Sequence, residues 1–167
     1  AGWTHVEYDG IRPARFQSRP DGVALEGQGD GSFIWRRVQG APGCLTWRWR
    51  VEAAPPPTDL TRRGGDDRAV TVAVGFEGWP TRSSVWQEPA LFYSPWMGGL
   101  GKVRILRPAT APSGRWFEER VNLAADWRAA FGGDPPPLQE IAIGTDGDDT
   151  RSRISAMVER IRFDPCG

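Results

Sequence analysis

The sequence is poor in the residues on which most catalytic sites depend. Among its 167 residues, His5 is the single histidine, and Cys44 and Cys166 are the two cysteines. Catalysis by a Ser–His–Asp or Cys–His arrangement needs a histidine beside the nucleophile, and His5 lies in a segment that alternates like a strand. One histidine also cannot supply the ligand sets of histidine-based metal catalysis. Neither kind of chemistry is therefore expected.

Long apolar runs and an excess of one charge are also missing. No stretch approaches the roughly 20 apolar residues that span a bilayer, so no transmembrane segment is expected. Lysine and arginine together number 21, as do aspartate and glutamate, and the formal net charge is zero. Tight binding of nucleic acid or of an anionic membrane needs a basic excess, so neither is expected as a partner. No signal peptide is visible, which fits a mature exported form as well as a trimmed one.

Turn residues, tryptophans and short alternating segments are abundant. The 21 glycines and 15 prolines stand in clusters between these segments, as in a β-rich domain with many turns. From residue 45 onward, apolar and polar side chains alternate, and Leu45, Trp47, Trp49 and Val51 share one face. This alternation predicts a half-buried strand whose two tryptophans belong to the core.

Other segments alternate in the same way. Residues 68–77 place valines and Phe76 on one face and small residues on the other, which leaves room for a second layer or a ligand. Residues 138–145 repeat the pattern. Weaker alternation predicts strands in segments 4–8, 14–17, 22–27, 32–38, 90–94, 102–106 and 115–121. These strands predict an all-β fold, namely an antiparallel, jelly-roll-like β-sandwich that forms a single domain over residues 1–167.

One short α-helix is expected within this sandwich. Asn122 is a favourable N-cap, and Leu123, Trp127 and Phe131 fall on one stripe of the helix. Gly132 and the prolines that follow it end the helix. Trp127 is therefore expected to anchor the helix on a sheet.

In the last predicted strand, the apolar positions switch from even to odd residue numbers part-way along the strand. Its apolar residues between 154 and 158 share one parity, whereas Ile161 and Phe163 take the other. A β-bulge near Glu159 or Arg160 would let both sets face the core.

The two cysteines leave two interpretations open. Cys44 begins the tryptophan-containing strand, and Cys166 lies near the end of the sequence. A disulfide would form between them in an oxidising compartment, and two buried thiols are the alternative. Their spacing matches no zinc or redox motif.

Four motifs occur in a recognisable order. The Trp-x-Trp strand of Trp47 and Trp49 is followed by Gly-Asp-Asp at 65–67, by an Asp-aromatic-Arg helix ending in Phe-Gly at 126–132, and by Thr-Asp-x-Asp-x-Thr at 145–150. With these motifs the chain resembles DUF3047, a bacterial family of unknown function. The resemblance extends over nearly the whole sequence.

The resemblance implies a periplasmic or secreted protein, because relatives often begin with export signals. It implies no established activity. Thr71 and Ala73 stand where members commonly carry an arginine and an aromatic residue. A family site built on that arginine would therefore be lost here or supplied from elsewhere.

Acidic residues gather beside two of the predicted strands. The residues are Asp66, Asp67, Asp146, Asp148 and Asp149. If strands 68–77 and 138–145 are antiparallel neighbours, these carboxylates converge at one corner. We favour a strand-entry turn whose aspartate charge is paired by Arg62, Arg63 or Arg68. One alternative is a structural Ca²⁺ held by the carboxylate oxygens. Arg151 and Arg153 would instead neutralise the cluster in a salt-bridge network. No other cofactor is expected.

A ligand surface is expected on the outward face of the tryptophan strand. Arg48 and Arg50 point away from the core and are suited to clamp carboxylate or sulfate groups of an acidic sugar, although solvated arginines need no ligand. Tyr93 and Trp96 lie in a segment rich in proline and glycine, where they are the expected stacking residues.

Carboxylates leave one catalytic alternative open. A glycosidase pair stands about 5 to 9.5 Å apart, and Glu88, Glu118, Glu119 and Asp67 are candidates for it. Because Glu118 and Glu119 point to opposite faces of one strand, only one of them enters a given cleft, and we assign Glu119 to the ligand site.

The expected function is non-catalytic binding of a carbohydrate or another small polar ligand at the bacterial cell envelope. One alternative is a carboxylate-dependent glycan-active enzyme. The other is a structural or protein-interaction module whose partner the sequence does not identify. Fold analogy contributes to the preference for carbohydrate, because β-sandwiches often bind glycans.

Overall fold

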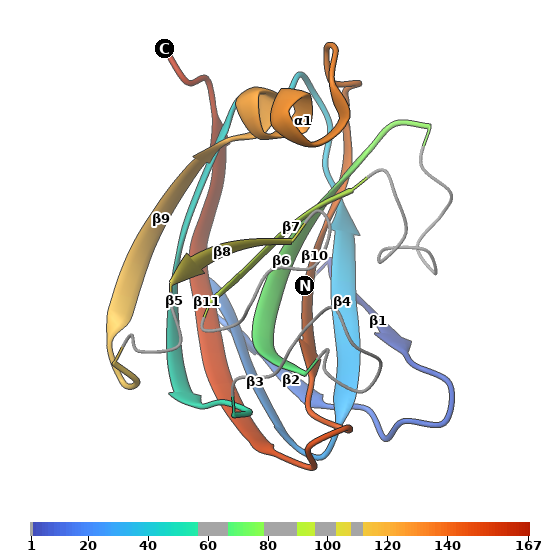
Figure 1. Cartoon of the computed structure of the whole chain (residues 1–167), viewed down its shortest axis with the longest axis vertical. Coiled ribbons are helices and arrows are strands. Elements are labelled where there is room, and N and C mark those ends of the chain that lie inside the picture. Colours follow the sequence, from blue (N-terminus) through green and yellow to red (C-terminus); the bar gives the residue numbers. More distant parts are fainter. Residues whose placement is uncertain (1, 57–66, 79–89, 96–102, 108–111) are drawn as a thin grey trace.

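The computed structural model describes residues 2–56, 67–78, 90–95, 103–107 and 112–167. Two β-sheets pack face to face, and a short helix lies across one end of them (Figure 1). The chain passes repeatedly from one sheet to the other, as jelly rolls do. The predicted antiparallel β-sandwich with one short helix is confirmed.

The two sheets have six and five strands. Sheet A has the order β1-β4-β10-β6-β7-β8, with β1 (Thr4–Glu7), β4 (Gly31–Arg37), β6 (Arg68–Phe76), β7 (Ala90–Pro95), β8 (Val103–Arg107) and β10 (Leu138–Asp146). Sheet B has the order β2-β3-β11-β5-β9, with β2 (Arg15–Arg19), β3 (Gly22–Gln28), β5 (Cys44–Ala53), β9 (Trp116–Asn122) and β11 (Arg153–Asp164). Neighbouring strands are antiparallel, except that β7 and β8 run parallel.

The last two strands occupy the middle of the two sheets. β10 lies between β4 and β6, and β11 lies between β3 and β5. Residues 147–152 connect them and cross from one sheet to the other. The centre of both sheets is therefore built from one C-terminal segment.

The main core lies between the sheets and contains the alternating face of β5. Leu45, Trp47, Trp49 and Val51 are each exposed by 2% or less, as the alternation predicts. The rings of Trp47 and Trp49 meet edge to face, with centroids 5.2 Å apart. The two tryptophans of this strand are thus core residues.

β6 is buried on both faces. Its valines and Phe76 face the main core, and every residue of the strand is buried. On the opposite face Ala73 lies in a second apolar cluster with Phe33 and Phe92, against which Tyr8 packs. The face of small residues is therefore filled by apolar packing.

The helix forms as the sequence predicts. Asn122 accepts a hydrogen bond from the backbone N–H of Ala125 at 3.0 Å, and α1 (Leu123–Phe131) ends at Gly132, whose φ is 79°. Trp127 is 7% exposed, and its ring centroid lies 4.6 Å from that of Phe76 in β6. In the part of the chain that the structure describes, no helix is long and apolar enough to cross a membrane.

A disulfide joins Cys44 to Cys166. It links the start of β5 to the residues that follow β11, so the disulfide interpretation is confirmed. Disulfides persist in oxidising compartments, and the bond is therefore consistent with a location outside the cytoplasm.

Candidate functional site

A hollow of about 420 Å³ lies on the outer face of sheet B, over β11, β5 and β9. Its lining includes Thr46, Arg48, Glu118, Arg120, Arg160 and Arg162. We call it the sheet B hollow. Four of these six side chains are guanidinium groups, which bind carboxylate, sulfate and sugar hydroxyl oxygens through several N–H donors at once.

A β-bulge in β11 shapes this hollow. Glu159 pairs with Arg48 and Arg162 with Thr46, so two residues of β11 stand opposite the single residue Trp47. The bulge confirms the prediction drawn from the change of parity. It keeps Ile161 against the core, while the exposed Arg160 lines the hollow.

The backbone around the bulge is tightly constrained. Arg160 has a φ of 57°, and its N–H donates to the carbonyl oxygen of Asp21 at 2.9 Å. Positive φ is unusual for a residue with a side chain. A Cβ at Gly22 would lie 2.1 Å from the carbonyl oxygen of Val158, so only glycine fits beside the bulged strand. Such enforced local strain is typical of positions that orient a functional side chain.

The expected arginine strand contributes one of its two arginines to the hollow. Arg48 donates to Glu159 Oε2 through Nε at 3.0 Å, and its guanidinium lies 4.2 Å from the ring of Trp116. Arg50 is ion-paired with Glu52 and does not line the hollow. The half-buried Trp116 is not itself a lining residue, but it contacts Arg48 and so lies beside the hollow.

Two other arginines of the hollow are held by contacts at its rim. Arg120 donates to the carbonyl oxygen of Cys166 at 3.2 Å. Arg162 donates to both carboxylate oxygens of Asp21 at 3.1 Å. These contacts fix the directions of the guanidinium groups and leave further N–H donors on each of them.

The structure places the expected stacking residues differently. Tyr93 is 1% exposed, its ring lies 5.7 Å from that of Trp47, and its hydroxyl donates to Asp126 at 2.7 Å. The expectation of an exposed Tyr93 is therefore wrong, because this side chain belongs to the core between the sheets. Trp96 lies outside the described residues.

Glu118 and Glu119 face opposite sides of β9, as predicted. Glu119 is 8% exposed and accepts a hydrogen bond from Trp49 Nε1 at 3.0 Å. Its carboxylate therefore points inward at the margin of the hollow, while the exposed Glu118 faces outward. Both residues line the hollow, but the Glu119 carboxylate is engaged by Trp49. Glu88 lies outside the described residues.

The acidic residues converge at the opposite end of the sandwich from α1. β6 and β10 are antiparallel neighbours, and carboxylate oxygens of Asp67, Asp146 and Asp148 lie within 4.8 Å of one another. This separation suits oxygen ligands on opposite sides of one Ca²⁺, which binds at 2.3–2.6 Å. We call these three residues the acidic corner. Asp66 lies outside the described residues, and the side chain of Asp149 is exposed.

Asp67 is used by the turn that follows β10. It is fully buried and accepts hydrogen bonds from the backbone N–H of Asp149 at 3.2 Å and of Thr150 at 2.7 Å. The hydroxyl of Thr150 donates to the same carboxylate. A carboxylate has about four acceptor positions, so three are occupied by this turn. These contacts support the strand-entry turn and leave Asp67 little capacity to bind a cation.

Of the arginines expected to neutralise the acidic residues, Arg62 and Arg63 lie outside the described residues, Arg151 and Arg153 are exposed, and Arg68 is buried opposite Asp146. Arg151 has a φ of 52° and an exposed side chain, and Arg153 is also exposed. Among the ion pairs of the described residues, none joins either arginine to the acidic corner. The buried Arg68 is the Cα partner of Asp146 across β6 and β10, which places a guanidinium side chain on the same face of the sheet.

Comparison with protein-family models identifies the family of this chain. The family model described as a protein of unknown function (DUF3047) matches residues 1–99 and 90–162. The chain belongs to the DUF3047 family. No curated protein matches it in sequence.

Three solved structures resemble this DUF3047 chain at low sequence identity. The K2 cleaved adhesin domain of Lys-gingipain is 12% identical with a TM-score of 0.48, and the match covers 98% of this chain and 90% of that domain. The K3 cleaved adhesin domain of Lys-gingipain from Porphyromonas gingivalis W83 is 12% identical with a TM-score of 0.41, and the match covers 96% of this chain and 93% of that domain. The secreted serine protease VesC from Vibrio cholerae is 10% identical with a TM-score of 0.38, and the match covers 94% of this chain but 25% of that chain. These similarities extend no further than the general fold.

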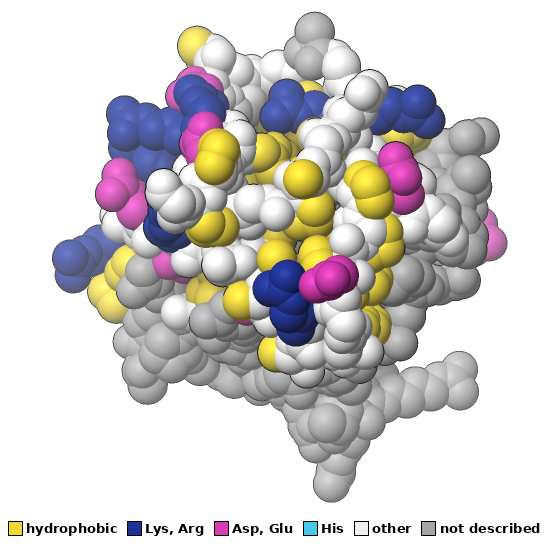
Figure 2. Space-filling view, turned by 90° about the horizontal axis from the view of Figure 1, so that it is seen from above, with side chains coloured by type: hydrophobic (Ala, Val, Ile, Leu, Met, Phe, Trp, Pro, Cys, Tyr) yellow, Lys and Arg dark blue, Asp and Glu magenta, His cyan; other side chains and the backbone are white. Residues whose placement is uncertain are grey.

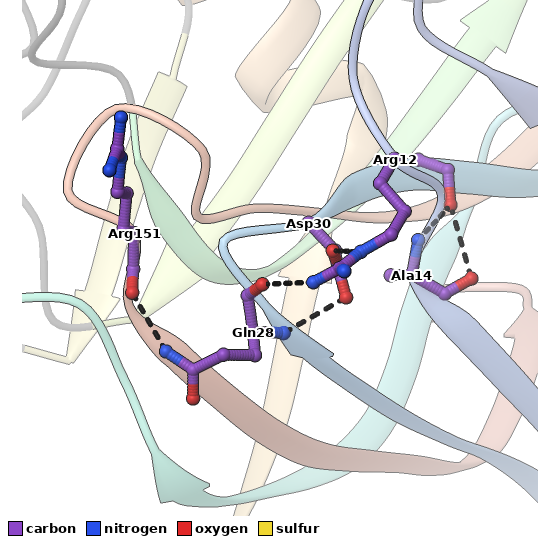
Figure 3. Close-up of polar contacts among 6 residues, drawn as sticks. Arg12, Ala14, Gln28, Asp30 and Arg151 are labelled. Atoms are coloured by element: carbon purple, nitrogen blue, oxygen red, sulfur yellow. Dashed lines mark hydrogen bonds and ion pairs between the residues drawn. The ribbon is translucent and has the colours of Figure 1, made fainter.

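A second buried carboxylate of the DUF3047 chain, Asp30, holds the turn between β3 and β4. Its side chain is 2% exposed, accepts from the backbone N–H of Gln28 at 2.9 Å, and pairs with Arg12 (Figure 3). Gln28 in turn accepts from Arg12 at 2.7 Å and donates to the carbonyl oxygen of Arg151 at 2.8 Å. Figure 3 shows the Arg151 guanidinium turned away from Asp30, so Arg151 contributes its backbone.

The contacts of Asp30 lower its pKa. Burial alone acts to raise the pKa, but the hydrogen bonds from Gln28 and Arg12 and the charges of Arg12 and Arg15 outweigh it. The pKa therefore lies below its ordinary value of 3.8. A lowered pKa keeps the carboxyl ionised, which suits a structural anion and is the opposite of what a general acid requires.

Asp30→Asn is expected to lower the free energy of unfolding at pH 7 by about 1 to 3 kcal/mol, because hydrogen bonds to a buried charge are lost. The stabilisation due to a lowered pKa is present above the unfolded-state pKa and is lost as the pH falls through the folded-state value. The difference between wild type and variant is therefore expected to shrink as the pH falls below 4. Urea unfolding at pH 7, 4 and 3 measures it.

Glu26→Gln is the matched control for this prediction. Its carboxylate is 61% exposed and lies 3.6 Å from the Arg15 guanidinium, and exposed pairs of this kind contribute little. The control is expected to unfold like the wild type at pH 7. A difference between Asp30→Asn and wild type that persists unchanged at pH 3 would contradict the assignment.

The sequence interpretation of this DUF3047 chain missed Arg120, Arg160, Arg162 and Trp116. Trp116 and Arg120 could have been predicted, because both alternate in β9 with the outward-facing Glu118. Arg160 and Arg162 follow the predicted bulge, but sequence alone does not show which way a bulged residue turns. The hollow therefore becomes visible only when β9, β5 and β11 are placed side by side.

Proposed function

We propose that this domain binds a carbohydrate or another small polar ligand in the sheet B hollow, without transforming it. The observation that carries the proposal is the bulge in β11, which adds the exposed Arg160 to a hollow that also contains Arg48, Arg120 and Arg162. The volume of about 420 Å³ falls within the roughly 300–1,000 Å³ of small-molecule sites.

The chemistry of the lining favours polar ligands. Arg48 stacks on Trp116, and a sugar ring or a planar acidic group can use the same combination of an aromatic edge and guanidinium donors. Glu118 adds one outward acceptor for hydroxyl groups. Glu119 points inward, so the lining offers a poor arrangement for the two opposed carboxylates of a glycosidase.

The distribution of charge over the molecule is mixed. Seen from the α1 end, the arginine side chains of the described residues form separate groups, with hydrophobic and acidic side chains between them (Figure 2). Local groups of this kind favour the recognition of small charged or polar ligands over that of an extended polyanion.

We propose that the domain acts outside the cytoplasm, in the periplasm or as a secreted protein. The Cys44–Cys166 disulfide supports this location, because such bonds are rare in reducing compartments. Melting temperatures in a range of thiol–disulfide buffers are expected to show that the oxidised form persists at periplasmic redox poise.

Isothermal titration calorimetry with neutral and acidic oligosaccharides tests the hollow. The affinity is measured for the wild-type protein and for the Arg160→Gln and Trp116→Ala variants. At least one sugar class is expected to bind, and each variant is expected to weaken it by about tenfold, which corresponds to roughly 1.4 kcal/mol. Arg160 is exposed, so Arg160→Gln should affect folding little; Trp116 is half-buried, so the unfolding curve of Trp116→Ala is measured before its affinity is compared.

Arg153→Gln is the control for this test. It removes an exposed arginine from the same strand, outside the lining of the hollow. Equal weakening by Arg153→Gln and Arg160→Gln would show a general charge effect and contradict the proposal. An absence of binding by every sugar would also contradict it and would favour a protein partner.

A further inference from the structure

We propose that the domain binds the anionic group of a ligand, a carboxylate or a sulfate, in a second pocket at the edge of the sandwich. This edge pocket has a volume of about 190 Å³, and its lining includes Trp3, Arg19, Asp21, Arg36 and Arg162. It lies where the edge strands of the two sheets, β1 and β2, approach each other near the bulge of β11.

Arg36 is the central residue of the edge pocket. It shares the parity of Ile34, which is 4% exposed in the main core, and its Cα partner in β10 is the fully buried Ile141. Arginine at this parity therefore places a guanidinium in the margin of the core. The group lies over the ring of Trp3, with its central carbon 4.9 Å from the ring centroid.

The Nε–H of Arg36 is buried and has no hydrogen-bond acceptor among the described residues. A charged donor in this state is unfavourable, because the hydrogen bonds that it made to water in the unfolded chain are not replaced by protein. An anion in the edge pocket would supply the acceptor. Stacking on Trp3 satisfies the charge only in part, because a ring face accepts no strong hydrogen bond.

The other charged side chains of the edge pocket reinforce the attraction. Arg19 and Arg162 line it together with Arg36, and Asp21 is the acid in the lining. Asp21 pairs with Arg162, with both oxygens 3.1 Å from the guanidinium. Three guanidinium groups and one carboxylate give the lining a formal charge of +2. Guanidinium forks match carboxylate and sulfate oxygens in pairs.

The size of the edge pocket limits what it binds. Its volume of about 190 Å³ is below the roughly 300–1,000 Å³ of most small-molecule sites, so it suits one charged group and not a whole oligosaccharide. Arg162 also lines the sheet B hollow, but Arg36 and Trp3 do not. The inference therefore goes beyond the proposed function and can fail independently of it.

The test uses the full chain with sodium sulfate, sodium glucuronate and glucose, at ionic strength balanced by sodium chloride. Arginine Nε–H resonances in ¹⁵N-labelled protein report binding directly, and Arg36→Gln assigns the resonance of Arg36. Sulfate, glucuronate or both are expected to shift this resonance saturably, whereas glucose leaves it unchanged. The two anions separate a sulfate site from a carboxylate site.

Three variants make the test specific. Arg36→Gln is expected to weaken anion binding about tenfold or more, because a charge-assisted donor is lost. Arg37→Gln removes the same charge from the adjacent, exposed residue and is expected to bind like the wild type. Arg19→Gln changes an exposed residue of the pocket, so it is expected to weaken binding without disturbing the fold.

Several results would overturn the inference. These are the absence of saturable binding by both anions, an equal effect of Arg36→Gln and Arg37→Gln, or wild-type affinity in both Arg36→Gln and Arg19→Gln. Arg160→Gln separates the two sites, because it is expected to impair the sheet B hollow and to leave the shift of Arg36 intact. Anion binding without sugar binding would contradict only the function proposed for the hollow.

Discussion

Reduction of the Cys44–Cys166 disulfide is expected to lower the free energy of unfolding by about 3 to 5 kcal/mol. The two cysteines are separated by 122 positions, so the bond closes a loop that contains most of the chain and strongly restricts the unfolded state. In the folded state Cys44 is the Cα partner of Asp164, which places the bond where β5 and β11 already pair. Native pairing at this point keeps the bond compatible with the fold.

Urea unfolding with and without a thiol-free reductant measures this effect. The Cys44→Ser, Cys166→Ser double variant serves as the control, because the reductant is expected to leave its unfolding curve unchanged. Cys166→Ser alone keeps the buried Cys44 and separates the loss of the cross-link from the loss of packing. Wild type that is equally stable in its oxidised and reduced forms would contradict the prediction.

Asp67→Ala is expected to lower the free energy of unfolding by about 2 to 4 kcal/mol, with or without Ca²⁺. The variant removes the acceptor of the backbone N–H groups of Asp149 and Thr150 and leaves these donors in a partly buried turn. Thermal and urea unfolding in the presence of Ca²⁺ or of a chelator measure both conditions.

Asp148→Asn distinguishes the turn from a calcium site. Its half-buried side chain belongs to the acidic corner but makes none of the hydrogen bonds to Asp67. If the turn interpretation holds, Asp148→Asn is nearly neutral and Ca²⁺ does not change the melting temperature. If Ca²⁺ stabilises the wild type and both variants lose that increment, the corner is a calcium site, and the turn is a secondary role of Asp67.

Local pattern was sufficient to predict the secondary structure of this domain. Alternation located the β5 core residues, the N-cap at Asn122 defined the helix, and the parity change after Val158 located the bulge. These features depend on residues close together in the chain. The order of the strands depends instead on residues far apart in the chain, because β10 pairs with the distant β4 and β6. Alternation within a strand does not identify which strands become its neighbours.

The candidate site was predicted less completely, for physical reasons that differ between residues. Tyr93 shares the parity of Leu91 and pairs with Val72, so alternation already favoured burial over the loop position suggested by the nearby proline and glycine residues. Arg48 was placed correctly because it alternates with Trp47 and Trp49. The edge pocket could not be predicted, because it forms only where the edges of two sheets meet.

The position of β10 and β11 determines when the molecule can fold. Because these last strands fill the middle of both sheets, the first 137 residues have no complete sheet to assemble while the ribosome is still adding the rest. β3 and β5, and likewise β4 and β6, become neighbours only through strands that are synthesised later. Folding of either sheet must therefore wait until the segment up to Asp164 has been synthesised, and the earlier strands stay without their central partners until then.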